Sequence, residues 1–115
     1  MENFYINFII LYLNMKKNNI LKTIRKNKNE LARFHVKKIG LFGSHAKNRA
    51  KKSSDIDFVV EFEKGKKNFK NFMELAFFLE KIFKKKVDLL TIESLNPHFK
   101  TSILKEAYFE KIENL

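Results

Sequence analysis

The most restrictive feature of the sequence is the segment 55–62, DIDFVVEF, in which two aspartates open a strongly β-prone apolar run. Its β-branched and aromatic residues favour a strand. Residues i and i+2 of a strand lie on the same face, so Asp55 and Asp57 project together while Ile56 faces the core. Two carboxylates held this close are costly unless a cation sits between them. The segment therefore predicts a central strand whose start carries a cation-binding acidic pair.

Hydrophobic periodicity on both sides of this strand predicts a small domain of the α/β (α+β) class. We expect a helix from Asn18 or Asn19, a second helix over 29–34, a strand over 36–42, a short helix from Ser44, a helix over 69–83, a strand over 86–92, and a helix capped by Asn96 and running to about Ala107. This order predicts a small mixed β-sheet with helices packed on one face. The phenylalanine-rich stripe of the 69–83 helix is assigned to the core.

The composition excludes several classes of protein. A chain of 115 residues allows one domain, and the absence of cysteine excludes disulfide scaffolds, zinc ribbons and thiol catalysis. At 44% hydrophobic residues it is too apolar for a disordered basic tail. The net charge of +11 invites a nucleic-acid interpretation, but only three of the 24 basic residues are arginine and the lysines are spread along the chain. We therefore interpret the charge as a solvated lysine surface and expect no stable nucleic-acid binding.

The first fourteen residues differ from the rest, because they carry one charge and an apolar run over 8–13. This run is too short to span a membrane, which takes about 20 apolar residues. Its charges lie in the wrong order for a secretory signal. Either segment 1–14 adds a helix or strand to the domain, or the start codon is assigned too early and Met15 is the true start; we favour the second. We expect a domain over 15–115, no membrane association and a cytoplasmic location.

A third carboxylate, Asp88, lies inside the apolar strand predicted over 86–92. A charge in such a run needs a partner or a metal ion. If this strand pairs beside the 55–62 strand, Asp88 joins Asp55 and Asp57. Three carboxylates of this kind are the ligand set for two Mg²⁺ ions in phosphoryl or nucleotidyl transfer.

The pair Gly43-Ser44 ends the first predicted strand and is separated from Asp55 by ten residues. Glycine allows a phosphate to approach the backbone closely, and Ser44 offers a hydroxyl and an N–H group at a helix N-terminus. Basic residues placed to neutralise a triphosphate follow within two turns: Lys47, Arg49, Lys51 and Lys52. Alone, a Gly-Ser pair is usually a turn and an Asp-x-Asp triplet a solvated strand start. Their combination at this spacing is far more specific.

With this spacing, Gly43-Ser44 and Asp55-Ile56-Asp57 resemble the signature of the DNA polymerase β-type nucleotidyltransferase superfamily. The short chain resembles its minimal nucleotidyltransferases, the MntA-like antitoxins of prokaryotic toxin–antitoxin pairs. The resemblance covers the chain from about residue 15 onward. It implies the nucleotidyltransferase fold, two Mg²⁺ ions held by Asp55, Asp57 and Asp88, and nucleotide phosphates held at Gly43 and Ser44, near Lys47 and Arg49.

The resemblance also implies an activity, the transfer of AMP from ATP to a tyrosine of a cognate HEPN-domain toxin, which silences the toxin. The chain departs from the family where members often read Gly-Ser-x-Ala-Arg-Gly, since it has Lys47 and Asn48 at the last two positions. Lys47 keeps the charge without the bidentate fork of arginine, and Asn48 tolerates the left-handed conformation of glycine. Three alternatives stay open: a decayed transferase that neutralises the toxin by binding alone, nucleotidyl transfer to a small molecule or RNA end, and a nucleic-acid-binding module.

Overall fold

The computed structural model describes residues 16–112, so the segment 1–14 and the choice of start codon lie outside the described residues. The described helices and strands follow in the order α2 (Lys17–Lys26), α3 (Lys28–Arg33), β1 (Val36–Phe42), α4 (Gly43–Ala46), β2 (Ile56–Phe62), α5 (Phe69–Phe83), β3 (Val87–Thr91), the 3₁₀ helix η1 (Ile92–Ser94), α6 (Pro97–Glu106) and β4 (Tyr108–Lys111). The predicted elements are therefore present, and one further strand, β4, follows them. None of the described helices is long and apolar enough to cross a membrane.

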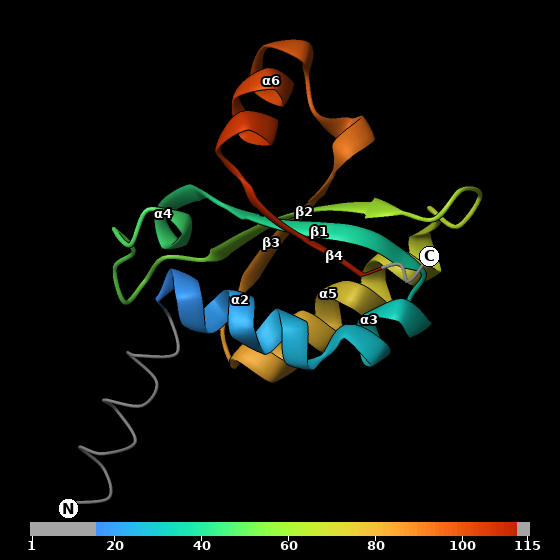
Figure 1. Cartoon of the computed structure of the whole chain (residues 1–115), viewed down its shortest axis with the longest axis horizontal. Coiled ribbons are helices and arrows are strands. Elements are labelled where there is room, and N and C mark those ends of the chain that lie inside the picture. The colour runs from blue at the N-terminus through green and yellow to red at the C-terminus, as the bar shows by residue number, and fades with distance from the viewer. Residues whose placement is uncertain (1–15, 113–115) are drawn as a thin grey trace, which may run out of the picture.

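The four strands form one mixed sheet in the order β3-β2-β1-β4, in which β2 and β3 are parallel and the other pairs antiparallel (Figure 1). The sequence patterns did not predict the edge strand β4, which pairs with residues 38–41 of β1. Its position depends on a contact between distant residues, because the Phe109 ring packs on Gly40. A Cβ atom added at Gly40 would lie 2.7 Å from that ring. A four-residue strand is too short for periodicity to reveal it.

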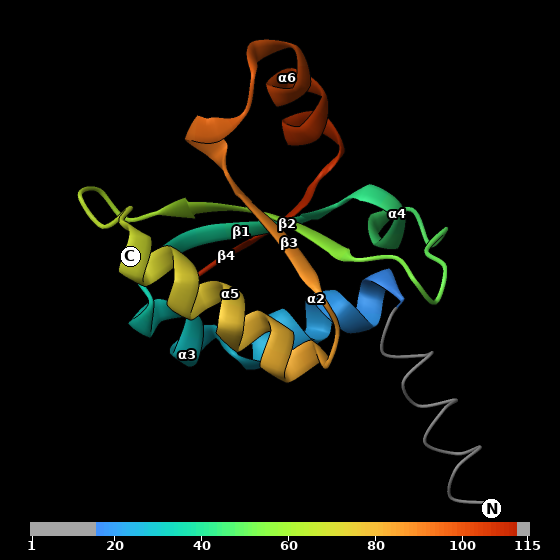
Figure 2. The ribbon, with the colours of Figure 1, turned by 180° about the vertical axis from the view of Figure 1, so that it is seen from behind.

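Helices α2, α3 and α5 cover one face of the sheet, and α6 lies on the opposite side (Figures 1 and 2). Alternation along β2 directs Ile56, Phe58 and Val60 into the core beneath the three helices. Two buried residues, Val59 and Ile92, lie apart from that cluster, where η1 packs against β2. The opposite face of the sheet is therefore covered only over part of its length by described residues.

The assignment of the whole phenylalanine stripe of α5 to the core is wrong for two of its members. Leu75, Leu79 and Phe83 are buried, whereas Phe69 and Phe77 are 79% and 63% exposed. Phe77 lies two residues from both Leu75 and Leu79, and two helical residues span about 200°, so it falls on the outer side of the helix. Apolar character alone did not distinguish the two sides of α5.

The turn from β1 into α4 requires a glycine at position 43 for two reasons. The φ angle of Gly43 is +73°, in the left-handed region that side chains disfavour. In addition, a Cβ atom at this position would overlap Oδ2 of Asp57. Just after α4, Asn48 has a φ angle of +54°, which confirms the prediction that it can replace glycine there. The turn is thereby held directly against the start of β2.

Replacing Gly43 with alanine should destabilise the fold more than the same change at Gly65. Gly65 has a similar φ angle, +79°, but no atom lies within 4 Å of an added Cβ, so Gly65→Ala isolates the backbone strain of about 1 kcal/mol. Gly43→Ala adds the collision with Asp57. Urea unfolding of both variants measures the difference. Equal losses of unfolding free energy would show that the approach of Gly43 to Asp57 imposes no constraint.

Candidate functional site

The acidic residues predicted from the sequence meet at one end of the sheet. Strands β2 and β3 run in parallel, and Asp57 is paired in register with Asp88. The residues that follow them, Phe58 and Leu89, belong to the core cluster, so the two aspartates project from the opposite face. Asp55 immediately precedes β2. The expectation that the third carboxylate lies on the strand beside the acidic pair is thus confirmed.

The carboxyl group of Asp57 lies close to other acidic side chains at this end of the sheet. The pKa of Asp57 is raised above its ordinary value, first by burial of the carboxyl group and then by the charges of Asp88 and Asp55. The charge of His45 opposes this and lowers the same pKa. An acid that is destabilised by its own acidic neighbours is stabilised when a cation binds among them.

The donor chemistry of the three aspartates suits a hard divalent cation, although the coordination shell is incomplete. Among the residues that the structure describes, no group of three His, Cys, Asp or Glu side chains is arranged to hold a metal ion as it stands. Asp88 is exposed and Asp55 half-buried, so both side chains have room to turn. Mg²⁺ characteristically retains several waters and uses one or two carboxylates together with substrate phosphates. In donor type, the three aspartates therefore fit Mg²⁺.

The residues predicted to bind nucleotide surround the turn next to this acidic cluster. Gly43 and Ser44 begin α4, and the backbone N–H groups of Lys47 and Arg49 both donate to the Ser44 carbonyl oxygen, at 3.2 and 2.9 Å. The side chains of Lys47 and Arg49 are exposed. The loop thus places two cations near Ser44 by backbone hydrogen bonds.

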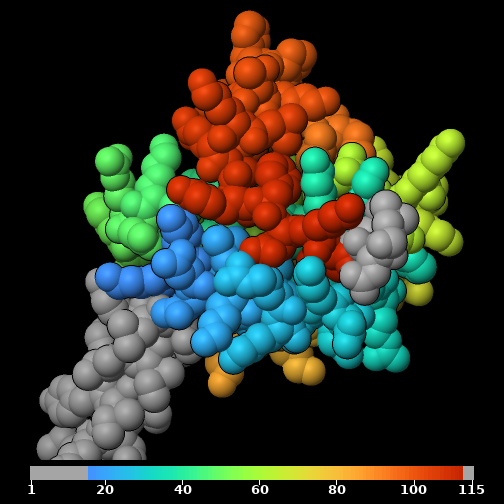
Figure 3. Space-filling model, viewed as in Figure 1, coloured from blue at the N-terminus to red at the C-terminus, as the bar shows by residue number. Residues whose placement is uncertain are grey.

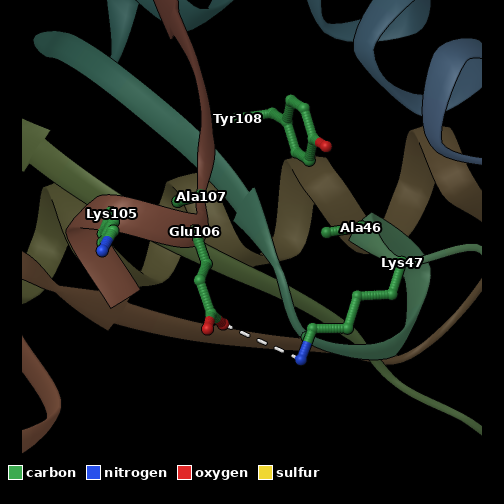
Figure 4. Close-up of a pocket in the computed structure, with 7 residues that line it drawn as sticks. Ala46, Lys47, Lys105, Glu106, Ala107 and Tyr108 are labelled. Carbon is green, nitrogen blue, oxygen red and sulfur yellow. Dashed lines mark ion pairs between the residues drawn. The ribbon is translucent and has the colours of Figure 1, made fainter. Parts of the chain in front are cut away.

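A pocket of about 450 Å³ lies between α4 and the end of α6 (Figure 4). It is lined by Gly43, Ala46, Lys47, Lys105, Glu106, Ala107 and Tyr108. Lys47 Nζ crosses part of it to form an ion pair with Glu106 Oε2 at 3.7 Å. No sequence pattern pointed to Glu106 or Tyr108 as site residues, because the strand β4, which was not predicted, brings the end of α6 beside α4.

His45, in α4, is buried, although the polar sequence around it did not indicate this. It is 1% exposed, and its Nε2 atom lies 3.4 Å from the Ser54 carbonyl oxygen. Ser54 in turn accepts a hydrogen bond at Oγ from the backbone N–H of Lys51. These contacts join α4 to the residue before Asp55. His45 therefore supports the loop that connects the glycine turn to the acidic pair.

The sequence matches a known family over most of its length. The profile described as a nucleotidyltransferase domain matches residues 19–109. A protein of Methanocaldococcus jannaschii, named provisionally as a protein adenylyltransferase, is 43% identical over 77 residues, which cover 67% of this chain and 82% of that protein. The protein adenylyltransferase MntA of Thermococcus cleftensis is 38% identical over 77 residues, covering 67% of this chain and 77% of its own length.

Solved structures share the fold. A structure described provisionally as a minimal nucleotidyltransferase aligns with a TM-score of 0.65 and 29% identity, covering 76% of this chain and 93% of that one. An MNT antitoxin in complex with the tri-AMPylated HEPN toxin of Shewanella oneidensis aligns with a TM-score of 0.50 at 20% identity, covering 79% and 72% of the two chains. At that identity the second likeness shows the fold alone. From the match over residues 19–109 and the arrangement of strands that carries the aspartates, the chain belongs to the nucleotidyltransferase domain family.

Proposed function

We propose that this protein is a Mg²⁺-dependent protein adenylyltransferase that transfers AMP from ATP to a tyrosine of a cognate HEPN-domain toxin and so acts as its antitoxin. The observation that carries the proposal is the in-register pairing of Asp57 with Asp88 on adjacent parallel strands, directly against the Gly43 turn. The names of the related adenylyltransferases and the HEPN complex of the structural neighbour support the choice of nucleotide and acceptor.

In the proposed reaction, the hydroxyl oxygen of the acceptor attacks the α-phosphorus of ATP in line with the leaving pyrophosphate. A bond forms between that oxygen and the α-phosphorus, and the bond from the α-phosphorus to the bridging oxygen of pyrophosphate breaks. The hydroxyl proton passes to a carboxylate, and Asp88 is suited to receive it because it is the exposed member of the cluster. Two Mg²⁺ ions held by Asp55, Asp57 and Asp88 would supply charge stabilisation for the attacking and leaving oxygens.

The triphosphate is proposed to lie over the Gly43 turn, where Ser44 offers its hydroxyl and N–H groups. Lys47 and Arg49 are exposed beside it and would neutralise phosphate charge. The present partner of Lys47, Glu106, is itself more than half exposed, and exposed ion pairs contribute little to stability. A triphosphate, with several negative charges, therefore displaces Glu106 from Lys47 at small cost.

Replacing Asp55 and Asp57 together with asparagine should abolish the transfer of label from α-³²P-ATP to the toxin, because the acidic ligands are removed without a change of side-chain size. Glu93→Gln, an exposed acid on η1, serves as the matched control and should retain activity. Unfolding curves verify that both variants fold. Persistent labelling by the double variant would refute the site. A wild-type protein that silences the toxin without labelling it would instead indicate neutralisation by binding alone.

Replacing Asp57 alone with asparagine should stabilise the metal-free protein at neutral pH. The pKa of Asp57 is raised on folding, so the folded state binds this proton more tightly than the unfolded state, and the free energy of unfolding falls as pH rises from about 3.8 through the raised value. Asparagine does not ionise, so the variant does not lose this part of its free energy of unfolding as pH rises. Thermal unfolding in EDTA should give a higher midpoint for Asp57→Asn than for wild type.

With Mg²⁺ and ATP added, the wild type should have the higher thermal midpoint of the two proteins, since ligands that bind only the folded state stabilise it. The wild-type midpoint should rise clearly and that of Asp57→Asn should stay nearly constant. Equal stabilisation of both proteins would place the cation elsewhere. An unchanged midpoint in EDTA would mean that the acidic cluster imposes no electrostatic strain on the fold.

A further inference from the structure

Helix α6 stands on the face of the sheet from which Asp57 and Asp88 project. Helices α2, α3 and α5 cover the other face, and both ribbon views place α6 opposite to them (Figures 1 and 2). In the space-filling view α6 protrudes from the rest of the molecule (Figure 3). Any group that reaches the carboxylates from outside must therefore approach along the side on which α6 lies.

No residue of α6 is buried within the described part of the chain. The helix has ten residues, and helices of this length are marginal in water unless one of their faces packs against something. Its largest side chain, Phe99, is 63% exposed, and Ile103 lies one turn further along the same face, half-buried. An exposed aromatic residue next to a half-buried aliphatic one, on a helix that no described element covers, is a candidate anchor for a protein partner.

The polar surroundings of this apolar centre are basic. His98 and Lys100 flank Phe99 and are exposed, and Lys105 is exposed at the far end of the helix. Glu106, the acidic residue of α6, lies about two turns from Phe99 at the end of the helix, next to Lys105. The surface therefore complements a partner that is acidic at its rim and apolar at its centre. A second copy of this chain fits poorly, because it brings the same net charge of +11.

We propose that the exposed face of α6, centred on Phe99, is the docking surface for the protein acceptor of the nucleotidyl group. The acceptor is a protein with an acidic surface and an apolar recess for Phe99, and docking there positions its hydroxyl over Asp57 and Asp88. The inference rests on the proposed function for the identity of the acceptor. Nucleic acid shares the negative charge but offers no match to an apolar centre in a helix face with no arginine.

The chain provides a matched control, since Phe77 on α5 is also 63% exposed but lies on the opposite side of the sheet. Phe99→Ser and Phe77→Ser should therefore be compared in the full-length protein. Both should bind ATP with Mg²⁺ as wild type does, because neither residue belongs to the proposed nucleotide site. Phe99→Ser should lower kcat/KM for the HEPN-domain toxin at least tenfold, roughly the effect of losing a central interface residue. Phe77→Ser should change it less than about twofold.

A charge reversal tests the basic rim by an independent measurement. Lys100→Glu should weaken association with the toxin and reduce its dependence on salt, whereas Lys81→Glu, exposed on α5, should leave both unchanged. Sedimentation of wild type and Phe99→Ser without toxin should give the same mass. The docking proposal would be overturned if the two serine variants had equal kinetics or if only Phe77→Ser were defective. It would also be overturned if wild type self-associated and Phe99→Ser did not.

The two proposals fail in different ways. If wild type binds the toxin through Phe99 but transfers no AMP to it, the docking surface stands and adenylyl transfer is refuted. If wild type transfers AMP and Phe99→Ser does so equally well, the activity stands and the docking surface is refuted. Loss of binding to a labelled RNA rather than to the toxin on substitution of Phe99 would likewise overturn the protein-acceptor assignment.

Discussion

The arrangement of the site depends on the close approach of the Gly43 backbone to the carboxylate of Asp57. Because an added Cβ atom would overlap Oδ2 of Asp57, the turn after β1 and the start of β2 are held together without an intervening side chain. Antiparallel pairing of Phe42 with Asp57 fixes the same register from the sheet side. The consequence is that the expected phosphate-binding backbone and the expected metal ligand share one surface. The backbone of this turn is thus preorganised by its contact with Asp57, whereas the side chains of Asp55 and Asp88 have room to turn.

This arrangement destabilises the charged form of one carboxyl group, that of Asp57. Burial and two neighbouring carboxylates raise the pKa of Asp57, while the buried His45 lowers it and supports the loop leading to Asp55. Burial of the flanking apolar side chains offsets this destabilisation. Ile56 and Phe58, on either side of Asp57, are 0% and 1% exposed in the core. Destabilised acids on a rigid strand are typical of functional sites, where the strain is relieved when ligand binds.

Local patterns were sufficient to predict the strands β1, β2 and β3 and the acidic cluster, because period-two alternation determines both the burial of a strand and the face on which its polar residues lie. Of the two predicted helix N-caps, the one for α6 was right and the one for α2 was wrong. Asn96 accepts a hydrogen bond from the His98 N–H and caps α6, whereas Asn18 and Asn19 lie inside α2. The strand β4 and the pocket beside it could not be predicted, because they depend on the packing of Phe109 against Gly40, about seventy residues earlier. The two sides of α5 were also indistinguishable, since both carry phenylalanine.

The exposed phenylalanines also bear on function. The described residues form one sheet with its helices, so any contact that they make with an acceptor uses the surface of that single unit. Apolar residues that fail to enter the core are then candidates for intermolecular contact, and the sheet separates them into two groups. Phe69 and Phe77 lie on the covered side, away from the carboxylates, and Phe99 lies on the open side with them. Among the residues that the structure describes, the open side alone combines an uncovered helix, a basic rim and a path to Asp57 and Asp88. The lysine-rich surface thus has a specific use at α6, where it selects an acidic protein partner by charge before the apolar contact forms.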